Sequence, residues 1–268
     1  MSTFTLTVSC PQRPGIVHAI TRFLYQHDGD IVEHQQFDDA VRGALRSVPV
    51  PVREWDAPLT EIVYVLQANC SFGSRADLVA DYRAALDRLG LTPPEGLRLL
   101  GDTFLEPAIR ALPALDALDE AILTIDQEFD HALAVRLGIA AMYVDRTDGC
   151  RTALWRVVDH GRAGGAIASA IKAFVLLGFD GVLSGDWDGA LQLTGEGLEY
   201  TSRHHYRLLG GFLQYDRAMI GAARGEDVAA RAMADELMGW AVPNRIGFVM
   251  QLASHVRAMA ALSTGDFE

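Results

Sequence analysis

A glycine followed by an acidic residue recurs three times in the C-terminal part of the chain, at constant intervals of 40 residues. The three pairs begin at Gly185, Gly225 and Gly265. Each follows a stretch rich in alanine and leucine, where a glycine typically ends one helix and an acidic residue starts the next. A fixed period of this size is typical of solenoids built from pairs of helices. We therefore expect a repeat region that binds a partner and performs no chemistry.

The third pair, Gly265-Asp266, is followed only by Phe267 and Glu268 in the sequence. A repeat unit buries its apolar face only when both of its helices are present. The third unit lacks its second helix, so the pattern predicts a solenoid that is truncated at its C-terminus.

The composition argues against several classes of protein. With 268 residues, 50% of them hydrophobic, the chain can bury the core of one large or two small domains. Its net charge of −12 argues against a nucleic-acid partner, because such binding depends on neutralising phosphates with Lys and Arg.

The cysteines and the apolar segments place the protein in the cytoplasm. Cys10, Cys70 and Cys150 are far apart and form no Cys-x-x-Cys motif, so we expect reduced thiols and neither a metal nor another cofactor. The N-terminus lacks a secretory signal, and the apolar run at residues 173–183 is too short to span a bilayer. We expect no membrane partner.

The first 40 residues have a different pattern. Residues 3–10 alternate between polar and apolar side chains, which predicts a half-buried strand. Pro11 to Gly15 interrupt the strand, and apolar residues then follow at helical spacing through about Gln26. Residues 31–37 can return as a second strand after a turn. The segment is therefore predicted to be a β-α-β unit.

Three stretches of this unit, residues 6–17, 23–24 and 31–39, resemble the start of formyltetrahydrofolate deformylase. In that family the stretch opens an ACT domain, a βαββαβ regulatory module. The resemblance implies an amino-acid ligand, bound at the interface of a homodimer by the loop after the first strand and the turn before the second. Those positions are Gln12, Arg13, Pro14, Gly15, Ile16 and Asp30.

The loop at Pro14 and Gly15 has two interpretations. Backbone N–H groups at the start of the following helix can face a carboxylate, and the helix dipole favours that anion. Alternatively, the two residues only set the geometry of the turn.

The sequence alone leaves alternatives for the remaining elements of an ACT module. Residues 41–52 or 61–67 are candidates for its third strand, residues 76–89 for its second helix and residues 96–100 for its fourth strand. The module would then extend to about residue 104, and otherwise residues 41–96 are a connector. Beyond Asp39 no motif of the deformylase's catalytic domain occurs, so we name no catalytic residue and favour a non-enzymatic protein.

From about Ala114 the pattern is helical, with short polar or glycine-rich breaks. We expect eight successive helices between Ala114 and the C-terminus. They cover residues 115–129, 130–144, 150–159, 166–183, 187–202, 205–223, 227–240 and 245–262.

Several strings of this region, at residues 140–146, 154–158, 161–166, 187–196 and 222–225, resemble the tetratricopeptide-like (TPR-like) region of large ATP-binding LuxR-type transcriptional regulators. The resemblance covers residues 97–268 and implies a protein or peptide partner. In that family an ATPase precedes the repeats and a DNA-binding helix-turn-helix follows them. The chain has neither a phosphate-binding loop nor a basic terminal helix.

Four further features have competing interpretations. Residues 161–165 could bind an anion, but an interhelix turn is favoured. His204 and His205 point about 100° apart on a helix, so they do not bind one metal ion together. Gly210 and Gly211 indicate a close helix crossing or a break. The aromatic residues are expected to pack in the core more often than to anchor a peptide; they are Trp155, Trp187, Trp240, Tyr200, Tyr206 and Tyr215.

The sequence thus predicts a mostly α protein, in which an N-terminal α+β ACT-like module precedes a TPR-like solenoid. Our hypothesis is a non-catalytic cytoplasmic module for sensing or protein interaction, formed by truncation or fusion of a LuxR-type regulator's helical region with an ACT-like segment. The alternative from the enzyme class is a deformylase-related hydrolase of 10-formyltetrahydrofolate. A third alternative is transcriptional regulation, which requires DNA binding.

Overall fold

The structure, a computed structural model, describes residues 55, 57–72, 76–125 and 130–265. This part of the chain is α-helical apart from turns and one short π-helix, and it contains no strand. The mostly α prediction is therefore confirmed for these residues. The β-α-β unit predicted at residues 1–40, with all six of its candidate ligand-binding residues, lies outside them.

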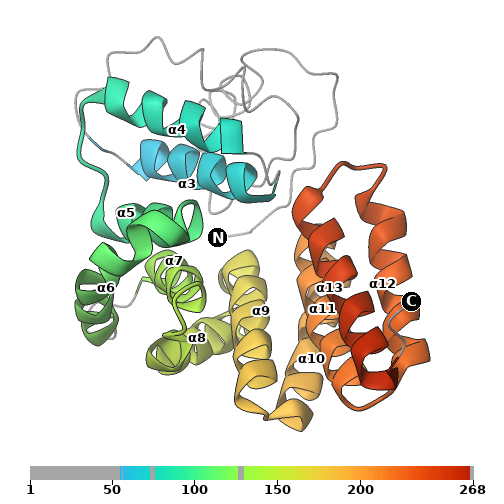
Figure 1. Cartoon of the computed structure of the whole chain (residues 1–268). Coiled ribbons are helices and arrows are strands. Elements are labelled where there is room, and N and C mark those ends of the chain that lie inside the picture. Colours follow the sequence, from blue (N-terminus) through green and yellow to red (C-terminus); the bar gives the residue numbers. More distant parts are fainter. Residues whose placement is uncertain (1–54, 56, 73–75, 126–129, 266–268) are drawn as a thin grey trace.

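The helices follow one another with short connections (Figure 1). Their bounds are α3 Ala57–Phe72, α4 Ala76–Leu89, α5 Glu95–Phe104, the π-helix η1 Pro107–Ala111, α6 Leu112–Thr124, α7 His131–Met142, α8 Thr147–Arg162, α9 Ile167–Ser184, α10 Trp187–His204, α11 Arg207–Ala223, α12 Asp227–Ala241 and α13 Gly247–Thr264. All eight helices predicted from residue 115 onward are present, and α6 begins earlier than expected, at Leu112.

From α7 onward the helices form a solenoid-like array in two rows. Each helix packs on the next, and α7, α9, α11 and α13 also pack on one another in that order. The helices α8, α10 and α12 make no such contacts among themselves. The odd-numbered helices therefore form the inner row of an arc, and α3 runs across the open side of that arc (Figure 1).

The three glycines of the 40-residue period all stand at helix ends in the left-handed conformation. Their φ values are 83° at Gly185, 80° at Gly225 and 71° at Gly265. Glycine adopts this region without the steric penalty that a Cβ brings. The predicted helix-ending role of these glycines is confirmed.

The acidic residues after two of these glycines differ in what they do. Asp186 caps α10, because its carboxylate accepts a hydrogen bond from Gly189 N at 3.2 Å. Glu226 holds the same position before α12 but makes no side-chain capping bond. The shorter Asp side chain is the better N-cap. Both acidic residues thus occupy the predicted N-cap position, but only Asp186 makes a side-chain capping hydrogen bond.

Two expected strands of an ACT module are wrong. Residues 61–67 lie inside α3 and residues 96–100 lie inside α5, whereas the helix expected at residues 76–89 is present as α4. The β-branched run around Val63 suggested a strand, but α3 carries apolar residues both on its buried face and on its half-buried opposite side, and such a helix shows no clear amphipathic period. The described elements between residues 57 and 104 are therefore the helices α3, α4 and α5, and the other candidate for the third strand, residues 41–52, lies outside the described part.

The buried apolar residues form three separate clusters. One joins α3, α4 and α5, a second extends from α5 to α10 and includes Leu213, and the third joins α11, α12 and α13. Cores divided in this way allow neighbouring parts of a solenoid to open without disrupting each other.

The helix α9 is the one described helix that is long and apolar enough to cross a membrane by length and composition. Ile171 and Phe174 within it are fully buried, and α9 packs against α7, α8, α10 and α11. Burial within the array accounts for this apolar composition.

The glycine pair in α11 marks a close helix crossing. The helix α11 continues through Gly210 and Gly211, and both residues are buried. A Cβ on Gly210 would lie 3.1 Å from Thr201 Oγ1, tighter than most such contacts. Of the two explanations offered by the sequence, the close approach is the one observed.

Candidate peptide-binding groove

The helix α3 has two faces with different partners. On one face Leu59, Val63 and Cys70 are buried against α4 and α5. Gln67 strengthens that packing, because its amide nitrogen donates to Tyr82 Oη at 2.8 Å and to the Leu97 carbonyl at 2.9 Å. This face anchors α3 to its two neighbours in sequence.

The other face of α3 meets the inner row of the solenoid. Glu61 forms an ion pair with Arg136 of α7. The Arg136 guanidinium also stacks on the Tyr64 ring at 5.2 Å, and Lys172 Nζ of α9 lies 5.0 Å from the centre of that ring. Tyr64 therefore sits between two cations from two different inner helices, an arrangement that favours an aromatic ring at this point.

An aromatic cluster holds the C-terminal end of α3. The ring of Phe72 lies 6.4 Å from Phe104 of α5, 5.8 Å from Phe212 of α11 and 6.3 Å from Phe248 of α13. Phe212 and Phe248 are themselves 5.6 Å apart. All four rings are only half-buried. Ring pairs at these distances add attraction beyond the area they bury.

Tyr143, at the end of α7, extends this cluster. Its ring is 5.0 Å from Phe104. Burial raises the pKa of Tyr143 to about 12, although a hydrogen bond with Ser71 of α3 acts in the opposite direction. The tyrosine hydroxyl is therefore neutral at physiological pH and available as a hydrogen-bond partner for α3.

We call the inner-face residues that contact α3 the groove residues: Arg136, Lys172, Phe212 and Phe248. None of the four was predicted from the sequence to bind another helix. Lys172 and Phe212 stand 40 residues apart, the period of the glycine turns, so they occupy the same position of successive inner helices. The 40-residue spacing could therefore have identified Lys172 and Phe212 as equivalent positions of the inner row. Arg136 and Phe248 become neighbours of α3 only through the fold.

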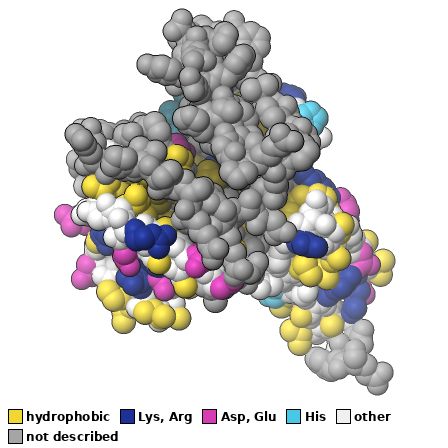
Figure 2. All heavy atoms as spheres, turned by 90° about the horizontal axis from the view of Figure 1, so that it is seen from above, with side chains coloured by type: hydrophobic (Ala, Val, Ile, Leu, Met, Phe, Trp, Pro, Cys, Tyr) yellow, Lys and Arg dark blue, Asp and Glu magenta, His cyan; other side chains and the backbone are white. Residues whose placement is uncertain are grey.

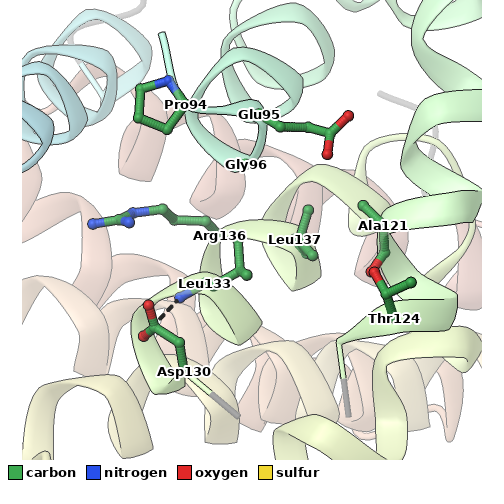
Figure 3. Close-up of a pocket in the computed structure, with 9 residues that line it drawn as sticks. All are labelled: Pro94, Glu95, Gly96, Ala121, Thr124, Asp130, Leu133, Arg136 and Leu137. Atoms are coloured by element: carbon green, nitrogen blue, oxygen red, sulfur yellow. Dashed lines mark hydrogen bonds between the residues drawn. The ribbon is translucent and has the colours of Figure 1, made fainter. Parts of the chain in front are cut away.

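A pocket of about 320 Å³ opens beside the groove, between α5, α6 and α7 (Figure 3). Asp130 on its wall caps α7, accepting hydrogen bonds from Ala132 N at 2.8 Å and Leu133 N at 3.3 Å. Arg136 borders both the pocket and the groove. The pocket lining contains two carboxylates, one guanidinium and no cysteine, histidine or lysine; it consists of Pro94, Glu95, Gly96, Ala121, Thr124, Asp130, Leu133, Arg136 and Leu137.

The two described cysteines have raised pKa values. Burial raises the pKa of the Cys70 and Cys150 thiols to about 12, with smaller contributions from Asp81 and Asp148 respectively. Both are free cysteines that stay protonated and unreactive at neutral pH. Within the described part of the chain, no group of three or more His, Cys, Asp or Glu side chains could hold a metal ion.

Five of the six predicted aromatic residues divide into two groups, and the sixth, Tyr206, is half-buried directly before α11. Tyr200, Tyr215 and Trp240 pack against the hydrophobic clusters, as expected for core residues. Trp155 and Trp187 instead lie under Arg162 and Arg224, at 5.6 and 5.7 Å, on the outer helices α8 and α10.

None of the three tryptophans contacts α3 through a described interaction. The aromatic residues that do so include phenylalanines of the inner row and α5, together with Tyr82 and Tyr143.

The two other local features are turns. Gly164, with φ of 86°, lies in the turn between α8 and α9, so residues 163–165 are part of an interhelix turn, whereas residues 161 and 162 end α8. His204 ends α10, and His205 follows it in the left-handed conformation with φ of 63°. Charges of both signs are mixed on the described surface in Figure 2, without a single basic patch on that face.

The geometry thus defines an α-helical, solenoid-like fold whose inner face holds a helix of its own chain. The similarities to known proteins lie elsewhere, in the N-terminal region. The chain is 52% identical over 40 residues to a formyltetrahydrofolate deformylase of Corynebacterium sp. and 49% identical over 41 residues to one of Synechocystis sp.. Each match covers 15% of this chain and 14% of the relative, so the chain spans only a small part of the length of these proteins.

No protein-family model matches the chain, and no solved structure is significantly similar to it. The deformylase resemblance of the N-terminal region is therefore confirmed over about 40 residues. The ligand-binding residues predicted there, Gln12 to Ile16 and Asp30, stay a prediction. So does the resemblance of the helical region to LuxR-type regulators.

Proposed function

We propose that this protein is a non-catalytic cytoplasmic interaction module whose inner solenoid face binds a helical segment of a partner protein. The observation that carries the proposal is that a helix already lies across this face. The contacts of α3 use Arg, Tyr and Phe side chains, the types enriched at protein interfaces and among their hot spots. Helix-in-groove recognition is an established mode of peptide binding.

The N-terminal segment supplies the sensing part of the proposal. Its match to the deformylases supports an ACT-like unit that binds an amino acid, with Gln12, Arg13, Pro14, Gly15, Ile16 and Asp30 as the ligand-binding positions. The helical region would then act as the TPR-like repeats of LuxR-type regulators are expected to act, by holding another protein. The acidic composition and the mixed surface charge favour a protein partner over a nucleic acid.

A selection experiment tests the proposed function. A phage-displayed library of helical peptides is selected on the full-length protein, and the dissociation constants of the recovered peptides are measured on two variants. The groove variant carries Phe212→Ala and Phe248→Ala, and the matched control carries Arg224→Ala on the opposite, outer side. We expect at least a tenfold loss of affinity in the groove variant alone, since buried aromatic anchors dominate interface energetics.

Two results would contradict this function. One is a failure to recover any peptide that binds the folded protein. The other is an equal loss of affinity in the groove variant and the outer control.

A second candidate function rests on the two deformylase matches. The protein would then hydrolyse 10-formyltetrahydrofolate, using residues that neither the described structure nor the motifs identify. Formate release by the purified protein, measured with a coupled formate assay, tests this alternative. Release above the rate of a heat-denatured control would replace the non-catalytic proposal.

A further inference from the structure

We infer that α3 is an exchangeable, tethered occupant of the groove, and that the groove accepts a partner helix with the same stripe of side chains. That stripe consists of an acidic residue, an aromatic residue three positions later and a phenylalanine eleven positions later. The inference rests on the proposed function and adds the chemistry of the partner and the regulation of its access.

The stripe lies on one side of α3. Successive helical residues are about 100° apart, so residues three and eleven positions after Glu61 return to within about 60° and 20° of its direction. These residues are Tyr64 and Phe72. Eleven residues span roughly 16 Å along a helix, which allows the stripe to reach from α7 to α13.

The groove offers a matching site for each member of the stripe. Arg136, only 9% exposed, pairs with the acid. Arg136 and Lys172 together flank the first aromatic ring, and Phe212 and Phe248 contact the second. Arg136 Nε has no hydrogen-bond partner, and the side chain of Glu61 is 58% exposed. The buried guanidinium can therefore donate to a carboxylate that is better placed than that of Glu61.

The way α3 is held allows exchange. Its fully buried residues belong to the cluster with α4 and α5, which is separate from the two clusters of the solenoid. Its contacts with the groove are half-buried, as in an interface between separable parts. Separation of α3 and α4 from the groove therefore leaves the contacts between these two helices and the solenoid cores in place, but it removes both helices from Leu97 of α5, a buried member of the same cluster.

The exchange also breaks interactions between the α3–α4 pair and α5. The hydrogen bond from Gln67 to the Leu97 carbonyl and the contacts of Arg83 with Gly101 and Glu106 must open when the α3–α4 pair moves. Gly90, with φ of 64°, and the residues before Pro94 connect that pair to α5. A groove that is open only part of the time lowers the apparent affinity of a partner by the open fraction.

A peptide that copies α3 tests the inference. The probe is a fluorescent peptide of residues 57–72 with Cys70→Ser and a soluble tail, titrated into the full-length protein and followed by anisotropy. The protein variant Tyr64→Ala/Phe72→Ala weakens the hold of the tethered helix and keeps Leu59, Val63 and Cys70, its buried apolar residues toward α4 and α5. We expect this variant to bind the peptide at least tenfold more tightly than the unmodified protein does.

Two matched controls define the contact. The peptide that itself carries Tyr64→Ala and Phe72→Ala should bind at least tenfold more weakly. Adding Phe212→Ala and Phe248→Ala to the protein variant should cause a similar loss, whereas adding Arg224→Ala should not. Circular dichroism checks folding, and the single variant Phe72→Ala replaces the double one if the latter has lost helix.

Several results would overturn the inference. They are equal affinity for the unmodified and the weakened protein, no binding to the weakened protein, or binding that ignores the phenylalanines of the groove. A dimer of the unmodified protein that dissociates on Phe212→Ala/Phe248→Ala would assign the groove to a second copy instead. If displayed peptides bind the groove but the α3 peptide does not, the proposed function stands and the exchange of α3 fails.

Discussion

Asp216 is a buried carboxyl group whose replacement should stabilise the fold in a pH-dependent way. The side chain is 1% exposed on α11, and its Oδ2 has no hydrogen-bond partner. Burial raises its pKa well above the ordinary value of 3.8. The site is tight, since a Cβ on Gly178 would lie 3.0 Å from Asp216 Oδ2. We therefore choose Asp216→Asn, which keeps the shape and removes the acid.

The sign of the effect follows from proton linkage. Above pH 3.8 the unfolded chain releases the proton that the folded carboxyl retains, so stability falls as pH rises until the folded pKa is reached. The loss is about 1.4 kcal/mol for each pH unit between 3.8 and the folded pKa. Asp216→Asn lacks this loss, so its advantage over the unmodified protein should widen by that amount.

Urea unfolding at pH 5, 6 and 7, followed by circular dichroism, measures the difference. The matched control is Asp116→Asn, an exposed carboxylate on α6, for which we expect a difference that does not change with pH. The reasoning would be refuted if the difference between Asp216→Asn and the unmodified protein stayed constant over this range. It would also be refuted if that difference narrowed with rising pH.

Three further predictions use other parts of the structure. Gly225→Ala should destabilise the protein by about 1 kcal/mol, because φ at Gly225 is 80°. Gly239→Ala, in the exposed interior of α12, should stabilise the protein by a similar amount. Changes in the free energy of unfolding in urea that have the same sign for both variants would contradict this. Asp130→Ala removes the cap of α7 and should cost about 1 kcal/mol, but Glu226→Ala should cost less, since Glu226 makes no capping bond. Cys70 and Cys150 should resist iodoacetamide at pH 8 until urea unfolds the chain, because burial raises their pKa values to about 12; peptide mass spectrometry that finds rapid native labelling would disprove this.

The helical repeat region could be predicted because its signals are local. A glycine at a left-handed position ends a helix whatever the rest of the chain does, so Gly185 and Gly225 located their turns correctly. The 40-residue period then indicated how successive helices pair. Burial of α9 and α11 against several neighbours agrees with their apolar composition.

The groove could not be predicted in the same way, because its contacts join residues far apart in sequence. Phe72 meets Phe212 and Phe248 only because α3 crosses the arc, and nothing local to Phe72 indicates that crossing. The segment that became α3 was also mistaken in part for a strand. Apolar residues on its half-buried side, in addition to those on its buried face, blurred the helical period, and its β-branched residues favoured the wrong alternative.

The central claim is that the inner face of the solenoid binds a helix in place of α3. Hydrogen–deuterium exchange of the full-length protein, with and without a peptide selected from the displayed library, tests it most directly. The account predicts faster exchange of amides in residues 61–72 when the peptide is bound, together with protection around Phe212 and Phe248. Unchanged exchange of α3, or protection confined to the outer helices, would contradict it.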